Sequence, residues 1–141
     1  MPKQANSDEE IQKCFTIMRE LRPHLNPESF LHLVRQMEQE GFQLAYLEDN
    51  NEVVAVAGYR IFTNLAMGKN LYIDDLVTAE QHRSKGYGER MLDWLRNTAK
   101  ENACRYLHLD SGTQRHQAHK FYFRQGLIIA AYHFAEEIQA T

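Results

Sequence analysis

The chain has 141 residues, of which 43% are hydrophobic and 25% charged, and its formal net charge is −3. This length and composition predict one folded domain over residues 1–141 and exclude a disordered chain. The small negative charge argues against nucleic-acid binding, which usually needs a clustered basic surface. The sequence has no apolar run near the ~20 residues of a membrane span, and its polar start is unlike a signal peptide, so we expect a cytoplasmic protein without a membrane partner.

The first forty residues carry the pattern of two amphipathic helices. Apolar residues recur at spacings of three and four over Ser7–Leu21, and Ser7 and Glu10 have the spacing of a capping box. A second helix is predicted from Pro27 to about Glu40, because proline suits the first turn and Gly41 is a natural stop.

The period then changes to that of β-strands. Phe42–Asp49 and Glu52–Phe62 are rich in β-branched and aromatic residues, and the turn-forming residues between them predict a hairpin. We expect a short irregular segment over Thr63–Asn70 and a third strand over Leu71–Thr78.

The second half of the chain alternates helices and strands. The pattern predicts a helix over Gly86–Asn102, a strand over Cys104–Asp110, a helix over Gln114–Gln125 and one or two closing strands within Leu127–Ile138. The resulting order, α-α-β-β-β-α-β-α-β with one further strand allowed, is typical of an α/β sandwich with a mixed sheet. The only two cysteines, Cys14 and Cys104, form no Cys-x-x-Cys pattern and are expected to be buried, inert thiols.

A glycine-bearing turn, residues 83–88, joins the third strand to the following helix. Such a turn exposes backbone N–H groups at the positive end of the helix dipole, where proteins commonly hold phosphates. Neither standard nucleotide-binding loop fits the sequence. The Gly68-Lys69 pair is followed by asparagine, which excludes a Walker A loop there, and Met91 stands where a Rossmann fingerprint after this turn needs its third glycine.

Two motifs carry a resemblance to a known family. Arg83, Gly86 and Gly88 form Arg-x-x-Gly-x-Gly, and Ala118–Leu127 is similar to Ala-x-x-x-Tyr-x-x-x-Gly-Phe with Leu127 in place of Phe. Together they resemble the pyrophosphate-binding and tyrosine motifs of the GNAT superfamily of acetyl-CoA-dependent N-acetyltransferases. The resemblance covers most of the chain and implies a three-layer α/β/α sandwich around a mixed, mostly antiparallel central sheet.

The resemblance also implies where acetyl-CoA, as co-substrate, binds. The strand before the loop would offer backbone groups to the pantetheine arm and the acetyl carbonyl, and the loop would hold the pyrophosphate. The residues concerned are Leu76, Val77, Thr78, Arg83, Ser84, Lys85, Gly86, Tyr87 and Gly88. Arg115 stands where family members often carry an asparagine that contacts pantetheine, which puts that contact in doubt and offers a phosphate contact in its place.

Tyr122 matches the family's tyrosine, which lies near the coenzyme sulfur and is the usual general acid. A phenol with a reference pKa of about 10 is protonated at neutral pH and can donate to a departing thiolate. The alternative interpretation is a core aromatic residue like its neighbours Phe121 and Phe123.

The acceptor amine is assigned to the central strand. Asp74 and Asp75 are adjacent there, so we expect one to point to each face of the sheet, with Asp74 as base or ammonium ligand and Asp75 as the fallback. Tyr72 and His119 are further substrate-binding candidates. The alternative for either aspartate is a turn cap or an arginine pair. His108, His116 and His119 lack the carboxylate or thiol partners of a metal site, so no metal is expected.

We therefore expect an N-acetyltransferase in which a primary amine of a small molecule or peptide attacks acetyl-CoA directly within a ternary complex. The alternatives are a non-catalytic, acetyl-CoA-binding regulatory domain and an acyltransferase that uses a longer acyl-CoA. The adjacent aspartates favour a small cationic amine, and a homodimer joined through the aromatic C-terminal strands is left open.

Overall fold

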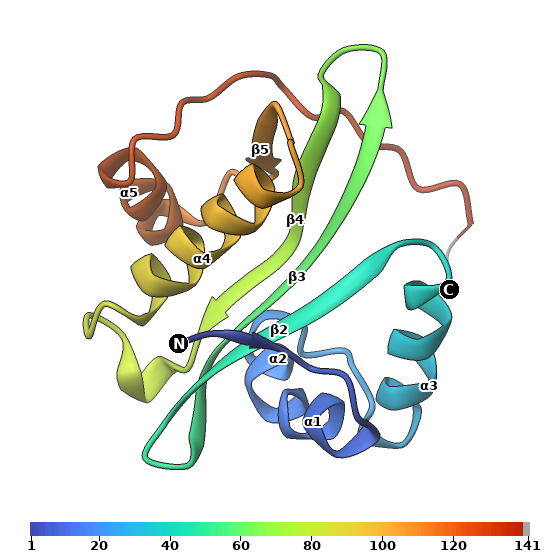
Figure 1. The fold of residues 1–141 in the computed structure, drawn as a ribbon, viewed down its shortest axis with the longest axis vertical. Helices are drawn as coiled ribbons and strands as arrows, with labels where there is room; N and C mark the ends of the chain where they lie inside the picture. Colours follow the sequence, from blue (N-terminus) through green and yellow to red (C-terminus); the bar gives the residue numbers. More distant parts are fainter. Residues whose placement is uncertain (140–141) are drawn as a thin grey trace. The chain divides into compact units, whose positions relative to one another are not determined.

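The computed structural model describes residues 1–139 (Figure 1). These residues form two compact units, the first over Met1–Leu109 and the second beginning at Asp110. Within the described residues, no helix is both long and apolar enough to span a membrane.

The first unit is built on a five-stranded sheet. The strands follow the order of the chain: β1 (Lys3–Gln4), β2 (Phe42–Asp49), β3 (Glu52–Asn64), β4 (Gly68–Thr78) and β5 (Tyr106–Leu109). Neighbours from β1 to β4 are antiparallel and β5 is parallel to β4, so the predicted mixed, mostly antiparallel sheet is confirmed. β1 escaped prediction because two polar residues carry no alternation.

Three helices cover one face of this sheet: α1 (Asp8–Lys13), α2 (Phe15–Leu21) and α3 (Pro27–Glu38). The helix predicted over Ser7–Leu21 is thus divided at Cys14, which is fully buried. Apolar side chains of the three helices form one core with residues of β2, β3 and β4, among them Ile11, Met18, Phe30, Val34, Tyr46, Val56 and Val77. Cys104, expected to be buried, is only partly so.

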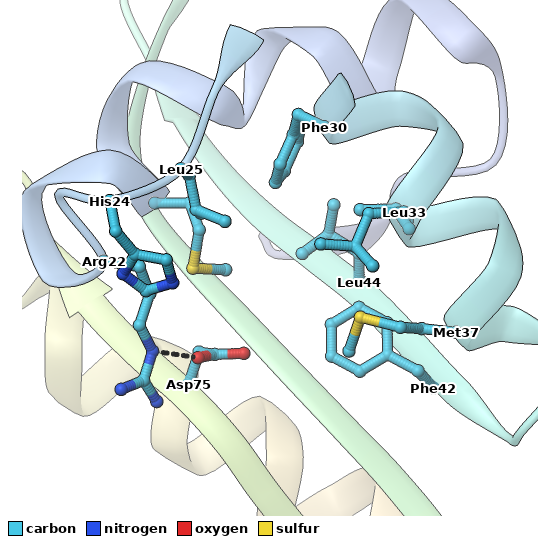
Figure 2. A pocket seen from close by; sticks show the side chains of 11 residues that line it. Arg22, His24, Leu25, Phe30, Leu33, Met37, Phe42, Leu44 and Asp75 are labelled. Carbon is cyan, nitrogen blue, oxygen red and sulfur yellow. Dashed lines mark hydrogen bonds and ion pairs between the residues drawn. The ribbon is translucent and has the colours of Figure 1, made fainter. Parts of the chain in front are cut away.

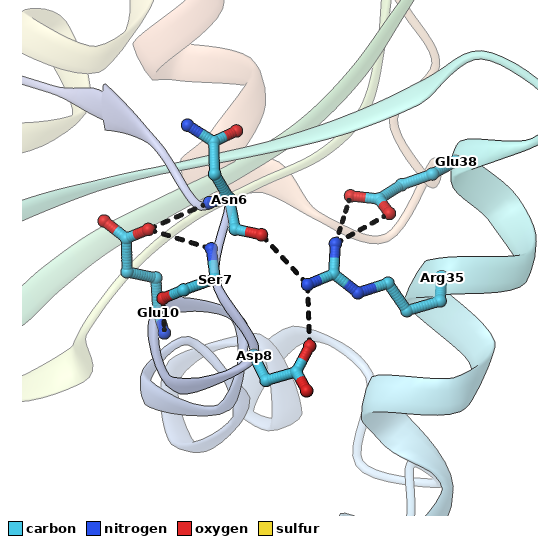
Figure 3. A network of polar contacts seen from close by, with 6 residues as sticks. All are labelled: Asn6, Ser7, Asp8, Glu10, Arg35 and Glu38. Carbon is cyan, nitrogen blue, oxygen red and sulfur yellow. Dashed lines mark hydrogen bonds and ion pairs between the residues drawn. The ribbon is translucent and has the colours of Figure 1, made fainter.

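A polar network fixes the start of α1 (Figure 3). The predicted capping box is present: Ser7 Oγ accepts a hydrogen bond from the Glu10 amide at 3.1 Å, and Glu10 Oε1 accepts one from the Ser7 amide at 3.0 Å. Arg35 of α3 donates to the Asn6 carbonyl at 2.9 Å and to Asp8 at 2.7 Å. The network therefore joins α3 to the beginning of α1.

The other face of the sheet carries α4 (Tyr87–Glu101). Met91, Leu92 and Leu95 of this helix are fully buried, and the ring of Trp94 meets Tyr59 of β3 edge-on with 6.0 Å between centroids. The first unit therefore has the expected three layers, helix, sheet and helix.

The connection between β3 and β4 is a second hairpin. We predicted an irregular segment over Thr63–Asn70, but β3 runs to Asn64 and β4 begins at Gly68. Asn64 Oδ1 accepts the Met67 amide at 2.7 Å and closes the turn. Asn70 is fully buried, and its amide nitrogen donates to the carbonyls of Phe62 and Gly68. These local side-chain bonds order a stretch whose composition suggested none.

A β-bulge interrupts β4 beside the site. Asp75 pairs with Gly58 and Ile73 pairs with Tyr59, which leaves Asp74 as an extra residue between them. An extra residue breaks the alternation of faces at that point. The expectation that Asp74 and Asp75 point to opposite faces is therefore wrong.

The second unit contains α5 (His116–Arg124), which lies within the predicted helix and ends before Gly126. Residues 127–139 form no strand, so the predicted closing strands are wrong for this part of the chain. Their apolar composition is strand-like, but a strand also needs a neighbour to pair with. Large apolar side chains of this segment are exposed instead: Ile128, Ile129, Tyr132, Phe134 and Ile138.

Candidate functional site

The loop of residues 83–88 has a backbone suited to anion binding. Ser84 and Gly86 both have left-handed backbones, with φ of +68° and +82°. Gly86 precedes the first residue of α4, and no side chain of residues 1–139 caps that end of the helix. Within the described part of the chain, the first amide groups of α4 consequently have no helical or side-chain partner, and they carry the positive end of the helix dipole.

The side chains of this loop divide into two kinds. Arg83, Ser84 and Lys85 are exposed, so their polar groups are accessible to a ligand. Tyr87 is buried, and its hydroxyl donates to Asp49 at the end of β2, which raises the pKa of Tyr87. The Tyr87 side chain thus fastens the loop to the sheet, and only its backbone is available to a phosphate.

One edge of β4 is open next to this loop. β4 pairs with β5 only from Asn70 to Ile73, because β5 ends at Leu109, whereas β4 continues to Thr78. Within the first unit, the backbone of residues 74–78 therefore has β3 on one side and no strand on the other. This segment includes Leu76, Val77 and Thr78, the residues that the resemblance assigned to the coenzyme arm.

Asp74 and Asp75 are each paired with an arginine. Arg60 of β3 holds Asp74 through two hydrogen bonds, Nε to Oδ1 at 3.0 Å and Nη2 to Oδ2 at 2.8 Å. Arg22, which follows α2, donates from Nε to Asp75 Oδ1 at 2.8 Å and from Nη2 to the Asp74 carbonyl at 3.0 Å. Burial raises the pKa of Asp75, and the Arg22 bond opposes that shift.

A cavity of about 160 Å³ lies beside Asp75 (Figure 2). Most of its wall is apolar and comes from the α2–α3 region and from β2, including Met18, Leu25, Leu33, Met37, Phe42 and Leu44. Asp75, Arg22 and His24 supply polar atoms on one side. Figure 2 shows the second carboxylate oxygen of Asp75 pointing towards the cavity, on the side of Phe42.

In the second unit, Tyr122 lies on α5 beside Arg115. Burial raises the pKa of Tyr122, while the charge of Arg115 and its hydrogen bond to the tyrosine oppose the shift. His119 Nε2 is 2.8 Å from the Gly112 carbonyl, so this ring bonds the loop before the helix. Ser111 Oγ is buried without a hydrogen-bond partner among the described residues, an orphan that a bound ligand could satisfy.

Two comparisons with known proteins address the family. Residues 9–127 match the model of the acetyltransferase (GNAT) family. The chain is also 35% identical over 138 residues to the uncharacterized N-acetyltransferase YhdJ of Bacillus subtilis strain 168, covering 96% of this chain and 97% of the relative. The chain belongs to the GNAT acetyltransferase family. It is accordingly an acetyl-CoA-dependent N-acetyltransferase, which uses acetyl-CoA and an amine acceptor.

Solved structures show the same GNAT fold. A GNAT family acetyltransferase of Staphylococcus aureus (USA300_TCH1516) has a TM-score of 0.81 and 18% identity, with 98% of each chain covered. AAC(6')-Iy, solved in complex with the bisubstrate analog CoA-S-monomethyl-acetylneamine, has a TM-score of 0.85 and 11% identity, with 99% of this chain and 98% of that one covered. The predicted fold class is thereby confirmed.

Sequence reasoning did not identify two arginines of this candidate site. Arg22 lies 53 residues before Asp75, and Arg60 lies 14 before Asp74. Pairing with an arginine is one of the alternatives for both aspartates, but no local spacing in the sequence identifies the partner. The apolar cavity could not be predicted for the same reason. The periodicity of α3 predicts that its apolar side chains are buried in a core, but it does not predict where that core contains a cavity.

Histidines do not gather into a metal centre in the described part of the chain, where no three of the ligand-type residues His, Cys, Asp and Glu lie close enough to hold an ion. His108 bonds the Asn70 side chain at 2.8 Å, and its ring meets Tyr72 edge-on. Tyr72 thus packs beside β5, next to the point where β4 and β5 part.

Proposed function

We propose that this enzyme acts in the cytoplasm and transfers the acetyl group of acetyl-CoA to a primary amine by direct attack within a ternary complex. The observation that carries the proposal is the open edge of β4 leading into the uncapped start of α4. An open strand edge offers backbone hydrogen bonds to an extended amide-bearing arm, and a helix start offers them to phosphate. These are the two parts of coenzyme A that an acetyltransferase must hold.

We propose the following roles for the coenzyme-binding residues. The backbone of residues 83–88 holds the pyrophosphate, and the exposed Arg83 and Lys85 add positive charge. Backbone groups of residues 76–78 bind the arm and polarise the acetyl carbonyl as part of an oxyanion hole. Arg115 is proposed as a second phosphate ligand and as a partner of Tyr122.

Acid and base are assigned to two residues. The amine nitrogen bonds to the thioester carbonyl carbon, the carbon–sulfur bond breaks, and the leaving thiolate takes a proton from Tyr122. The amine loses its proton towards Asp75. We favour Asp75 over Asp74 as base because Arg60 engages both oxygens of Asp74, whereas Asp75 lies at the cavity. Tyr72 and His119 remain proposed substrate contacts.

We further propose a single catalytic domain over residues 1–141 and a homodimer. The family match over residues 9–127 crosses both compact units, which supports one domain. The exposed apolar side chains of residues 127–139 support a dimer, because a large exposed apolar surface commonly marks a contact site.

Release of free coenzyme A thiol from acetyl-CoA, measured with a panel of amines, tests this function. We expect release that depends on the amine and a matching mass gain of one acetyl group on it. Tight binding of acetyl-CoA without thiol release on any amine would support the regulatory alternative. Faster thiol release from a longer acyl-CoA than from acetyl-CoA would support the alternative of an acyltransferase that uses a longer acyl-CoA.

A further inference from the structure

The cavity beside Asp75 has the size of a single small apolar group. Its volume is about 160 Å³, and an engineered apolar cavity of ~150 Å³ is known to hold one benzene molecule. Ligand pockets are typically apolar with a few polar groups that fix orientation. This cavity has that composition, with one carboxylate, one guanidinium and one imidazole on an otherwise apolar wall.

The charges at the cavity do not suit a polycation. Among the described residues, Asp75 is the only carboxylate in the wall, and Arg22 already pairs with it at 2.8 Å. The neighbouring carboxylate, Asp74, is held by Arg60. A polyamine or an aminoglycoside, with several ammonium groups, would need further carboxylates that this wall lacks. One ammonium group can share the free oxygen of Asp75.

The position of Asp75 connects the cavity to the proposed chemistry. Asp75 precedes Leu76 on β4, where the open strand edge is proposed to hold the acetyl group. An amine at the Asp75 carboxylate is therefore next to the reacting carbon, while the rest of the molecule extends between α3 and β2.

We propose that the acceptor is a small monoamine with one apolar group the size of an aromatic ring. The apolar group fills the cavity beside Asp75, and the amino group lies at the Asp75 carboxylate. This inference rests on the proposed function and names its substrate class. The small cationic amine that the sequence favours is thereby narrowed to one that carries a single charge and one apolar group.

Phenethylamine, isopentylamine, spermidine and neamine, each assayed for thiol release with acetyl-CoA, form the test. We expect the kcat/KM of phenethylamine to be at least about tenfold above those of spermidine and neamine. Burying an aromatic group is favourable, and a tenfold ratio requires only a small difference in binding free energy. Isopentylamine should fall between them. Equal or higher values for the two polycations would overturn the inference while leaving the acetyltransferase function intact.

Leu33→Glu tests the cavity itself, because Leu33 lines it yet is 40% exposed, so the fold should tolerate the change. Gln36→Glu places the same charge on an exposed position of α3 outside the cavity wall. We expect Leu33→Glu to raise the KM for phenethylamine about tenfold, with the KM for acetyl-CoA unchanged, and Gln36→Glu to leave both unchanged. Equal phenethylamine KM values in the two variants would place the acceptor elsewhere.

Calorimetric titration of phenethylamine into the protein saturated with coenzyme A separates binding from turnover. Binding that Leu33→Glu weakens, without thiol release on any amine, would support the cavity assignment and sink the proposed function. Absence of binding to the unaltered protein would overturn the assignment, whatever the other amines do.

Discussion

Arg22 donates from Nε to Asp75 Oδ1 at 2.8 Å, and this bond links the end of α2 to the bulged part of β4. The pair leaves the Asp75 carboxylate with one oxygen bound and one directed towards the cavity (Figure 2). A carboxylate held by one oxygen keeps its position while the other oxygen remains able to accept a proton or an ammonium group.

Asp75→Asn should remove the proposed base. Burial raises the pKa of Asp75 above its ordinary value of 3.8, so the acid limb of the rate profile should lie above that pH in the unaltered enzyme. We expect the variant to lose kcat/KM for the amine by about 10²-fold and to lose this limb, with acetyl-CoA affinity retained. Asp74→Asn is the matched change. If it removed the limb while Asp75→Asn kept it, the roles of the two residues would be reversed.

Tyr122→Phe should slow turnover far more than it weakens coenzyme binding. Burial raises the pKa of Tyr122, so the phenol is protonated at neutral pH and able to serve as an acid. We expect kcat to fall by roughly 10²-fold or more, while the Kd of acetyl-CoA, measured by calorimetry, changes little. Unchanged turnover would leave Tyr122 with a packing role only.

Gly86→Ala should weaken acetyl-CoA binding. Gly86 has φ of +82°, where a Cβ costs about 1 kcal/mol, so the loop would relax away from the geometry that presents the first amides of α4. Gly41→Ala is a matched control, because Gly41 has φ of +95°, equally open surroundings and a position away from the loop. Both variants should unfold at lower urea concentration, but only Gly86→Ala should raise the KM for acetyl-CoA. A similar KM in both would argue against the phosphate role of the loop.

Glu10→Gln should lower stability at neutral pH but not in strong acid. Hydrogen bonds from the Ser7 amide, the Tyr46 hydroxyl and the Asn6 amide lower the pKa of Glu10 from 4.5 to about 2. A lowered pKa in the folded state stabilises the protein above pH 4.5, and that contribution is lost as the pH falls from 4.5 towards 2. Urea unfolding should show a difference between the two proteins at pH 7 that shrinks towards pH 2. A difference independent of pH would mean that Glu10 acts without its charge.

Replacing Tyr132 and Phe134 by serine should weaken the proposed dimer. Both side chains are exposed, at 86% and 91%, so their loss costs the isolated chain little. We expect sedimentation to show a dimer for the unaltered protein and a monomer for the double variant. Leu65→Ser removes another exposed apolar side chain, in the β3–β4 turn, and should leave the association state as it was. A monomer for all three proteins would rule out this contact.

The sequence predicted best those features that local chemistry decides. The capping box of Ser7 and Glu10, proline at the first turn of α3 and the bounds of β2 all follow from neighbouring residues, and the structure has each of them. The bulge at Asp74 could not be predicted, because one extra residue in β4 shows only when the strand is paired with β3. The strand-like composition of residues 127–139 likewise gave a wrong prediction, because strand pairing depends on a neighbouring strand outside the segment.

The same distinction between local and tertiary features applies to the candidate site. The glycine loop can be predicted because a left-handed backbone position favours glycine, and Gly86 occupies such a position. The pairs Arg60–Asp74 and Arg22–Asp75 and the apolar cavity depend on the tertiary packing of α2, α3 and three strands, for which local spacing holds no information.

Gly58, the partner of Asp75 across the bulge, has a consequence for how acceptor choice could change. A methyl group built on Gly58 would lie 2.5 Å from the Phe42 ring and 2.7 Å from Asp75 Oδ2. The aromatic wall and the carboxylate are therefore neighbours only because hydrogen occupies the space between them. A single added carbon would push the hydrophobic and the charged parts of the proposed acceptor cavity apart, so a change at Gly58 would alter the proposed substrate range without adding a side chain to the cavity wall.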